Sequence, residues 1–265
     1  MGYLTSIGFY VPDWNGLTIT SLIFGLLLSI SAIATSFTDT TPYSKFGNRP
    51  KLDTIPSKKA MLLIYVPSVL ACFCIQPRIS FTTHFDIVHA LVTLHFVKRV
   101  LEVLFVHLYK SKTSFETVIP IMVTYAMTTV LDLLIVRRMP EVVFSQKWTQ
   151  CGAILVIVGE IVSVYHHVLL RQLRTSPQIS KKNYQLPRGG LFNYIVAPHY
   201  LAEQVVFLGF ILLSQNIVTV ALKLFPFIYL TDRARKTRAW YNLNLVDRQS
   251  KKDLQQRKNL IPFIW

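Results

Sequence analysis

The stretch His95-Phe-Val-Lys98-Arg99-Val-Leu-Glu102-Val-Leu-Phe-Val-His107 places two cations, an acid and two imidazoles inside a run that is otherwise apolar from Ile87 to Leu108. A charge in the hydrocarbon layer of a membrane is costly, so such groups usually face a bundle interior and mark a site. On a helix, Glu102 follows Lys98 by four residues and Arg99 by three, so it can pair with both. The stretch predicts a polar cavity among membrane helices. The alternative is a structural ion pair at a helix end that reaches toward water.

The composition favours a membrane protein. The 265 residues are 52% hydrophobic with a mean hydropathy of +0.41, which is too apolar for an ordinary soluble domain. A membrane span needs roughly 20 residues, with about 17 at the lower end. Apolar runs recur at 17–36, 60–76, 87–108, 117–136, 152–170, 194–213 and 216–230. We therefore expect an all-α, polytopic membrane helix bundle with about seven transmembrane helices, in a single domain over residues 1–265.

The charge is unevenly placed along the chain. The net charge is +15, and from Arg171 onward basic residues far outnumber acidic ones. We expect two basic loops, Arg171–Arg188 and Arg233–Lys258, on the cytosolic face, because short loops rich in Lys and Arg prefer that side. There they can bind anionic membrane lipids or phosphate-bearing ligands. The basic segments belong to no recognition module, so a nucleic-acid partner is not expected.

A second polar stripe follows one face of the predicted fifth helix. Spacings of three and four residues bring to that face Glu160, Ser163, His167, Arg171 and Arg174. An apolar helix with such a stripe needs a polar partner in the bundle. A solvated helix end explains Arg171 and Arg174 alone, but it does not explain the polar groups deeper in the helix.

Two further clusters lie nearer the C-terminus. Pro198-His199-Tyr200-Leu-Ala-Glu203 stands at a predicted helix start, where proline is favourable. Tyr200 is either a hydrogen-bond donor to a carbonyl oxygen in a low-dielectric site or an interfacial aromatic anchor. The cluster Arg233-x-Arg235-Lys236-x-Arg238 suits phosphate recognition, or it anchors the last helix on the positive side of the membrane.

Several common sites are absent from the sequence. Neither G-x-G-x-x-G nor G-x-x-x-x-G-K-[ST] occurs, which excludes Rossmann and P-loop nucleotide sites. No G-x-S-x-G nucleophile elbow occurs either. The seven histidines lack close metal-ligand spacing and the three cysteines form no metal pattern, so no metal site is expected.

Six motifs occur in order along the chain. They are Pro42-Tyr43-Ser-Lys-Phe46, His95-x-x-Lys98-Arg99-x-x-Glu102-x-Leu-Phe-x-His107, His166-His167-x-Leu-Leu-x-x-Leu-Arg174, Tyr184-x-Leu-Pro-x-Gly-Gly-Leu-Phe192, Pro198-His-Tyr200-x-x-Glu203 and Ile261-Pro-Phe263. Together they resemble the membrane steroid 5α-reductase superfamily. The resemblance implies a seven-helix membrane reductase that moves hydride from NADPH to an activated C=C bond, with an NADPH-binding half at about 149–265. The combination of motifs is most similar to a plant-type group close to the very-long-chain trans-2-enoyl-CoA reductases.

The resemblance also implies roles for individual residues. Lys98 and Tyr200 match positions regarded as catalytic in the enoyl-CoA reductases, and we expect Tyr65 to act with Tyr200. Three residues of the opening stretch, His95, Arg99 and Glu102, are expected to line the polar cavity. The positions that contact NADPH in the family, or support those contacts, hold Ser163, His167, Arg171, Arg174, Tyr184, His199, Glu203, Arg233, Tyr241 and Arg257.

The chain departs from the family's pattern at four of these places. Ser163 and His199 each replace an Asn. Tyr65 stands where steroid enzymes place the Glu that holds the steroid carbonyl, and Phe96 replaces the tyrosine partner of that Glu. These departures weaken a steroid assignment more than they weaken a reductase assignment.

The expected function is therefore NADPH-dependent reduction of a conjugated C=C bond in a lipid, trans-2-enoyl-CoA in very-long-chain fatty acid elongation. The implied partners are the acyl-CoA or sterol substrate, membrane lipids and fatty acid elongase components, and the implied location is the endoplasmic reticulum membrane. The alternatives are a 3-oxo-Δ4-steroid 5α-reductase or other sterol or polyprenol reductase, and a non-enzymatic lipid-binding scaffold. A transporter is disfavoured because no inverted repeat is visible.

Overall fold

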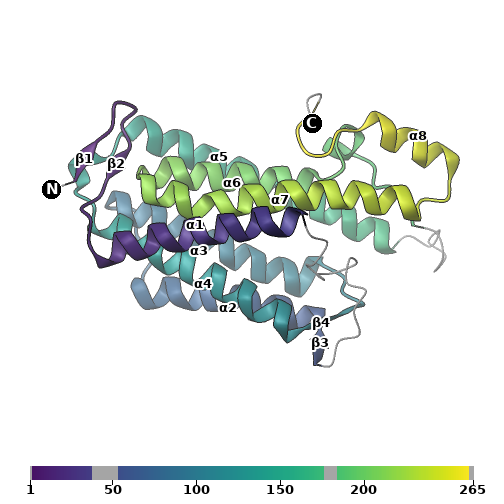
Figure 1. The fold of residues 1–265 in the computed structure, drawn as a ribbon, viewed down its shortest axis with the longest axis horizontal. Coiled ribbons are helices and arrows are strands. Elements are labelled where there is room, and N and C mark those ends of the chain that lie inside the picture. The colour runs from purple at the N-terminus through teal and green to yellow at the C-terminus, as the bar shows by residue number, and fades with distance from the viewer. Residues whose placement is uncertain (1, 38–52, 176–183, 263–265) are drawn as a thin grey trace.

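The computed structural model describes residues 2–37, 53–175 and 184–262, and within them the chain is almost entirely helical. The helices are α1 (Gly16–Phe37), α2 (Ser57–Ile75), α3 (His84–Leu101), α4 (Phe115–Arg138), α5 (Gln146–Thr175), α6 (Pro198–Ser214), α7 (Ile217–Asn244) and α8 (Arg248–Gln256). Two antiparallel strand pairs accompany them, β1 (Tyr3–Leu4) with β2 (Tyr10–Val11), and β3 (Thr54–Pro56) with β4 (Lys112–Ser114). Figure 1 shows α1 to α7 as a bundle along the long axis, with α8 turned back beside the end of α7. The predicted all-α bundle is confirmed.

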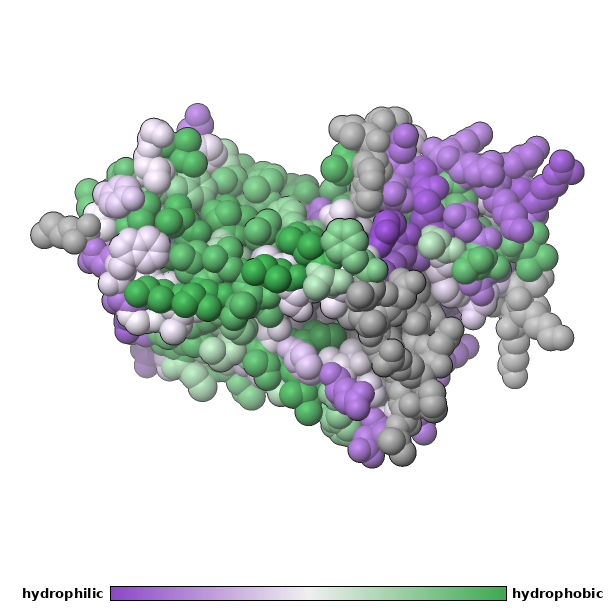
Figure 2. Space-filling model, in the orientation of Figure 1, coloured by the Kyte–Doolittle hydropathy of each residue, from purple (hydrophilic) through white to green (hydrophobic). Residues whose placement is uncertain are grey.

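The surface of the bundle is that of an integral membrane protein. Helices α1, α2, α4 and α5 are long and apolar enough to cross a membrane, and α6 is apolar but shorter, at 17 residues. Large apolar side chains such as Leu27, Ile30 and Ile161 are exposed on these helices. In Figure 2 this face of the bundle is hydrophobic, and hydrophilic groups gather around α8. The predicted motif Pro42–Phe46 lies outside the described residues.

Close backbone contact joins α5 and α6. A Cβ atom added at Gly209 would lie 2.8 Å from the carbonyl oxygen of Gly152 and 2.7 Å from Cγ2 of Val156. Small residues let membrane helices approach closely, and that approach matters because lipid supplies no hydrophobic driving force between helices. The two helices therefore form a fixed pair, and both contribute side chains to the polar cluster described below.

Helix α3 carries the charged stretch into the middle of the bundle. Its N-terminus has a capping box in which the Thr83 hydroxyl accepts from the backbone N–H of Asp86 and the Asp86 carboxylate accepts from that of Thr83. The helix contacts α2, α4, α5 and α6 along its length. It ends in a π-helical turn, Glu102–Val106, a local widening that is common at functional sites.

The prediction of a basic loop over Arg233–Lys258 is wrong. Helix α7 continues through that segment to Asn244, and α8 follows after three residues. Ion pairs on one face and buried residues on the other stabilise this extension of α7. Asp232 pairs with Arg235 at 2.8 Å and with Lys236 at 2.9 Å, at helical spacings of three and four. The opposite face buries Arg233, Ala234, Thr237 and Tyr241, so the charges mask an amphipathic continuation of the helix.

The first basic segment, Arg171–Arg188, is also partly helical, because α5 runs on to Thr175. The turn Arg188–Gly190 that follows has positive φ angles of 94° at Gly189 and 51° at Gly190. These angles favour glycine, because any other side chain is strained in this backbone conformation.

Helix α8 closes the C-terminal region. Asp247 caps it by accepting from the backbone N–H of Ser250 at 2.7 Å, and hydrogen bonds from the Ser250 backbone and hydroxyl lower the pKa of that carboxyl. Leu254 of α8 packs in a cluster with Leu186, Tyr241 and Leu245. The cluster ties α8 to the end of α7 and to the segment before the glycine turn.

The α5–α6 contact leads to a stability prediction. Gly209→Val should destabilise the protein by about 1–3 kcal/mol, because the new side chain must push the two backbones apart. Gly16→Ala is the matched control, since a Cβ atom there meets nothing within 4 Å. Thermal unfolding in detergent, monitored by size-exclusion chromatography, should show a lower unfolding midpoint for Gly209→Val and an unchanged midpoint for Gly16→Ala. Equal midpoints for the two variants would contradict the proposed packing.

Candidate functional site

The charged residues of α3 and the π-helical turn meet carboxylates from α5 and α6. Lys98 Nζ lies 2.5 Å from Glu160 Oε2, and Arg99 Nη1 lies 2.7 Å from Glu102 Oε2. Lys98 Nζ is also 3.6 Å from Glu102, so the pairing of Glu102 with both cations predicted from their spacing is present. All four side chains are largely buried. The polar cavity expected from the opening stretch is therefore a closed network of ion pairs.

Glu203 of α6 joins this network from the opposite side. One of its oxygens lies 3.6 Å from Lys98 Nζ and 3.7 Å from Arg99 Nη1. Ser163 of α5 donates to the same oxygen at 3.1 Å and accepts from Lys98 at 3.3 Å. Two fixed cations thus face three carboxylates, which belong to Glu102, Glu160 and Glu203.

Histidines extend the network in two directions. His95 Nδ1 contacts Glu160 Oε1 at 2.5 Å, and His167 Nδ1 contacts Glu102 Oε1 at 2.9 Å. The adjacent His166 faces away, because its Nδ1 contacts the Val162 carbonyl and its Nε2 accepts from the Leu191 N–H. The two neighbouring histidines therefore contact different parts of the structure, as their angular separation of about 100° on the helix requires.

Tyr65 of α2 is bound to the cationic side of the network. Arg99 Nη2 donates to the Tyr65 hydroxyl at 2.7 Å, and the guanidinium lies 4.9 Å from the ring centroid. Tyr125 contacts this ring edge-on at 5.5 Å, and Phe96 in turn contacts Tyr125 at 6.0 Å. Because its oxygen accepts from Arg99, the buried hydroxyl keeps its own proton available for donation to another acceptor.

Tyr200 lies away from the ion pairs. It packs with Leu201 against a cluster of Ala197, Ala234 and Leu260, so its environment is set by α7 and the C-terminal segment. Tyr229 of α7 is close enough to interact electrostatically with both Tyr200 and Tyr65. The two tyrosines predicted to act together are therefore both near Tyr229.

His199 stands between the two regions. Its ring lies 4.2 Å from that of Tyr200 and 5.6 Å from that of His167, measured between centroids. Its Nδ1 atom is buried and has no hydrogen-bond partner within the described residues. A buried polar atom of this kind usually meets a ligand or an ordered water.

Three of the arginines predicted to hold cofactor phosphates donate to backbone carbonyls in different segments. Arg171 donates to the carbonyl oxygens of Phe105 and Val106, and Arg174 donates to that of Leu108 at 2.6 Å. The buried Arg257 donates to the Pro187 carbonyl at 2.7 Å. Arg233 and Tyr241 are buried on one face of α7. Arg174 and Arg257 both interact electrostatically with Tyr241, near the end of α7 that leads to α8.

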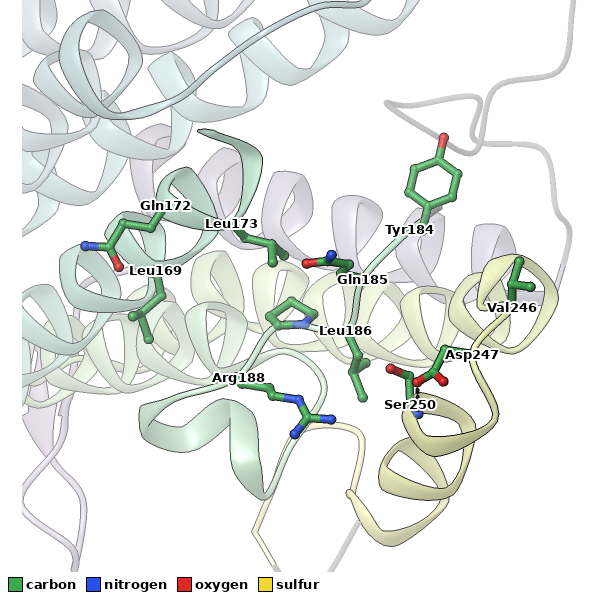
Figure 3. Close-up of a pocket in the computed structure, with 11 residues that line it drawn as sticks. Leu169, Gln172, Leu173, Tyr184, Gln185, Leu186, Arg188, Val246, Asp247 and Ser250 are labelled. Atoms are coloured by element: carbon green, nitrogen blue, oxygen red, sulfur yellow. Dashed lines mark hydrogen bonds between the residues drawn. The ribbon is translucent and has the colours of Figure 1, made fainter. Parts of the chain in front are cut away.

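A groove of about 590 Å³ opens at that same end, between the last turns of α5, the segment before the glycine turn and the start of α8 (Figure 3). Tyr184 is the predicted site residue that lines it, and its ring contacts Trp240 edge-on at 4.5 Å. Leu169, Leu173 and Leu186 give the groove an apolar side, and Arg188 and Asp247 give it a charged rim. None of the ion-paired residues of α3 lines this groove.

The sequence analysis missed the contacts of three residues in or beside the ion-paired network. Glu160 was recognised as part of the α5 stripe but not as the nearest partner of Lys98. Tyr125 and Tyr229 carry hydroxyl groups next to Tyr65, yet each is a single aromatic residue in an apolar run. No local pattern distinguishes such a residue from ordinary packing, so only the helix arrangement shows its place.

Comparison with known proteins assigns the C-terminal part of the chain. Residues 115–265 match the family described as 3-oxo-5-alpha-steroid 4-dehydrogenase. The chain is 32% identical over 127 residues to 3-oxo-5-alpha-steroid 4-dehydrogenase 1 of Rattus norvegicus, which covers 46% of each protein. It is 32% identical over 114 residues to 3-oxo-5-alpha-steroid 4-dehydrogenase 2 of Homo sapiens, covering 43% of this chain and 42% of that relative. The match thus spans about half the length of these curated relatives, and the family region begins after Tyr65, Lys98 and Arg99.

The network leads to a second stability prediction. Glu160→Gln should destabilise the protein by about 3–5 kcal/mol, because it removes the nearest carboxylate of the buried Lys98 and the carboxylate that contacts His95. Asp253→Asn is the control, since it breaks the surface pair of Asp253 with Arg188 and should cost about 0–1 kcal/mol. Thermal midpoints in the same detergent compare the two. Similar midpoints would show that the buried pairs contribute little.

Proposed function

The chain belongs to the 3-oxo-5-alpha-steroid 4-dehydrogenase family, and from that premise we propose that it is a membrane-embedded reductase. Its reaction adds a hydride and a proton across a C=C bond conjugated to a carbonyl group in a lipid. The observation that carries the proposal is the Tyr65 hydroxyl, buried among apolar helices and held by Arg99 at 2.7 Å. A preorganised donor in a water-poor site stabilises the negative charge that develops on a carbonyl oxygen during reduction.

The residues of the site fit NADPH, the hydride donor implied by the resemblance. The cofactor is a polyanion, and Arg174 and Arg257, both close enough to Tyr241 to interact with it electrostatically, offer positive charge for its phosphates together with Arg171 and Arg233. The unpartnered Nδ1 of His199 offers a buried polar contact suited to the carboxamide of a nicotinamide. Ser163, His167, Tyr184, Glu203 and Tyr241 complete the set that we propose to bind or support NADPH.

In this proposal NADPH supplies the hydride that reduces the carbon β to the carbonyl. The Tyr65 hydroxyl would donate a hydrogen bond to the carbonyl oxygen, and Arg99 would hold the phenol oxygen in place. A proton from water would then complete the addition at the carbon α to the carbonyl. Lys98 adds positive potential beside the developing enolate. Tyr200 also donates a hydrogen bond to the carbonyl oxygen as the enolate charge develops. The carboxylates Glu102, Glu160 and Glu203 fix the two cations, so that the charges do not reorganise when the substrate enters.

Two substrate classes remain in the proposal, and each has its own support. A trans-2-enoyl-CoA agrees with Lys98 and with the tyrosine at position 65, where steroid enzymes of the resembling family have a glutamate. In that case we propose fatty acid elongase components as partners and the endoplasmic reticulum membrane as the location. A 3-oxo-Δ4 steroid is supported by the names of the relatives that match residues in the second half of the chain.

The proposal predicts the effect of removing single hydroxyl groups. Tyr65→Phe should lower kcat by roughly 10²–10³-fold, the usual cost of one oxyanion donor, and Tyr200→Phe should lower it in the same direction. NADPH affinity should change little in Tyr65→Phe, because that residue touches the carbonyl and not the cofactor. Absorbance at the nicotinamide band measures turnover, and fluorescence quenching measures binding.

Tyr165→Phe serves as the control for this pair. Tyr165 lies on α5 with about half of its surface exposed, outside the ion-paired network. Its turnover should equal that of the unmodified protein. Near-normal turnover of Tyr65→Phe would exclude Tyr65 as the carbonyl donor.

A further inference from the structure

His95 of α3 is buried inside the bundle beside the ion-paired network. It is 1% exposed, and its Nδ1 atom lies 2.5 Å from Oε1 of Glu160. A carboxylate only accepts hydrogen bonds, so Nδ1 carries the hydrogen and donates it to Glu160. The other oxygen of the same carboxylate, Oε2, lies 2.5 Å from Lys98 Nζ. Glu160 therefore bridges an imidazole and an ammonium group, with one oxygen for each.

Three phenylalanine rings fix the orientation of the His95 imidazole. Phe96 contacts it edge-on at a centroid distance of 4.9 Å, and Phe207 and Phe210 of α6 contact it at 6.0 and 5.8 Å. All three phenylalanines are buried themselves. A ring enclosed in this way cannot turn without repacking its neighbours, because protein interiors have few voids. The imidazole is therefore the fixed end of the bridge.

Lys98 is the adaptable end of the bridge. Its ammonium group lies on a flexible stem of four carbons, and its three donors rotate freely. Two further carboxylates, those of Glu102 and Glu203, each have an oxygen 3.6 Å from Lys98 Nζ. A small rotation of the Glu160 carboxylate would therefore let the ammonium group move toward either of the other acids.

The neutralisation of Lys98 does not require His95, because three carboxylates already surround the ammonium group. What the imidazole adds is an anchor on the second oxygen of Glu160. Sites that depend on a precisely placed charge need such an anchor, a neighbour that is itself locked by packing and hydrogen-bonds the group holding the charge.

We propose that His95 is a positioning residue of the reductase site. Through Glu160 it holds the Lys98 ammonium group in one place, so that the positive charge is already oriented when the substrate carbonyl becomes an enolate. The effect on turnover rests on the proposed function, whereas the link from His95 through Glu160 to Lys98 does not. His95 itself contacts neither the substrate nor NADPH.

Replacements of His95 in the full chain in detergent test this role. The readout is NADPH oxidation with trans-2-hexadecenoyl-CoA or a 3-oxo-Δ4 steroid, whichever the unmodified protein reduces. His95→Phe keeps a ring among the three phenylalanines but removes the donor. It should lower kcat by roughly 10-fold to 100-fold, which corresponds to one hydrogen bond to a charged group. The KM for the acceptor and the affinity for NADPH should change little.

Two amide variants separate the donor from the packing of the ring. His95→Asn should retain most of kcat, because its amide N–H can take the place of Nδ1. His95→Gln should lose activity as His95→Phe does, because its longer side chain carries the amide one carbon further. The contrast between the two amides carries the test even where His95→Phe does not fold. Equal kcat values in His95→Asn and His95→Gln would contradict the role of the Nδ1 donor.

His89→Phe is the matched control. His89 is a second fully buried histidine of α3, and its Nε2 contacts the Cys72 carbonyl at 3.0 Å instead of an acid. Its kcat should equal that of the unmodified protein. In a Lys98→Met background His95→Phe should lower kcat no further, because His95 acts only through Lys98. A merely structural role would lower kcat by the same factor in both backgrounds.

The stability of the same variants tests the link independently of activity. Because His95 and Lys98 act on one carboxylate, the losses of thermal midpoint in His95→Phe and Lys98→Met should not add in the double variant, whereas those of His89→Phe and Lys98→Met should add. Additive losses for His95 and Lys98, or a kcat of His95→Phe equal to that of His89→Phe, would overturn the proposal. An unmodified protein that oxidises no NADPH would contradict the reductase function instead, and the midpoints would still decide whether the link exists.

Discussion

Lys98 and Arg99 lie inside a membrane bundle, and the carboxylates that neutralise them come from the π-helical turn, α5 and α6. An unpaired charge at that depth is costly, so α3 can pass through the bundle only where α5 and α6 bring Glu160 and Glu203 to meet it. The close α5–α6 approach at Gly152 and Gly209 serves the same end, because it fixes the two acidic side chains relative to each other. The position of Tyr65 then follows, since its hydroxyl is bound to Arg99.

The sequence predicted the parts of this arrangement that depend on local spacing. The apolar runs located the helices, and the three- and four-residue intervals from Arg99 and Lys98 to Glu102 predicted the pairs that the structure contains. The stripe on α5 pointed to Ser163 and His167 for the same reason.

What the sequence could not predict depends on contacts between distant segments. The second half of α7 was not recognised as a helix, because its charged residues lower the average hydropathy of the segment. The buried residues on its other face, which include Tyr241, do not raise that average enough to reveal the helix. Spacing along the chain does not place Glu102 beside His167, yet the bundle brings their side chains to 2.9 Å. Arg171 and Arg174 were predicted as phosphate ligands, and the structure shows them donating to carbonyls at the end of the π-helical turn and just after it.

The central claim is that this network serves conjugate reduction in a membrane lipid. The most direct test is NADPH oxidation by the purified full chain, offered trans-2-hexadecenoyl-CoA and a 3-oxo-Δ4 steroid in parallel. The account predicts acceptor-dependent oxidation with at least one of the two, and a product saturated at the conjugated C=C bond. NADPH that neither binds nor is oxidised in the presence of either acceptor would contradict it.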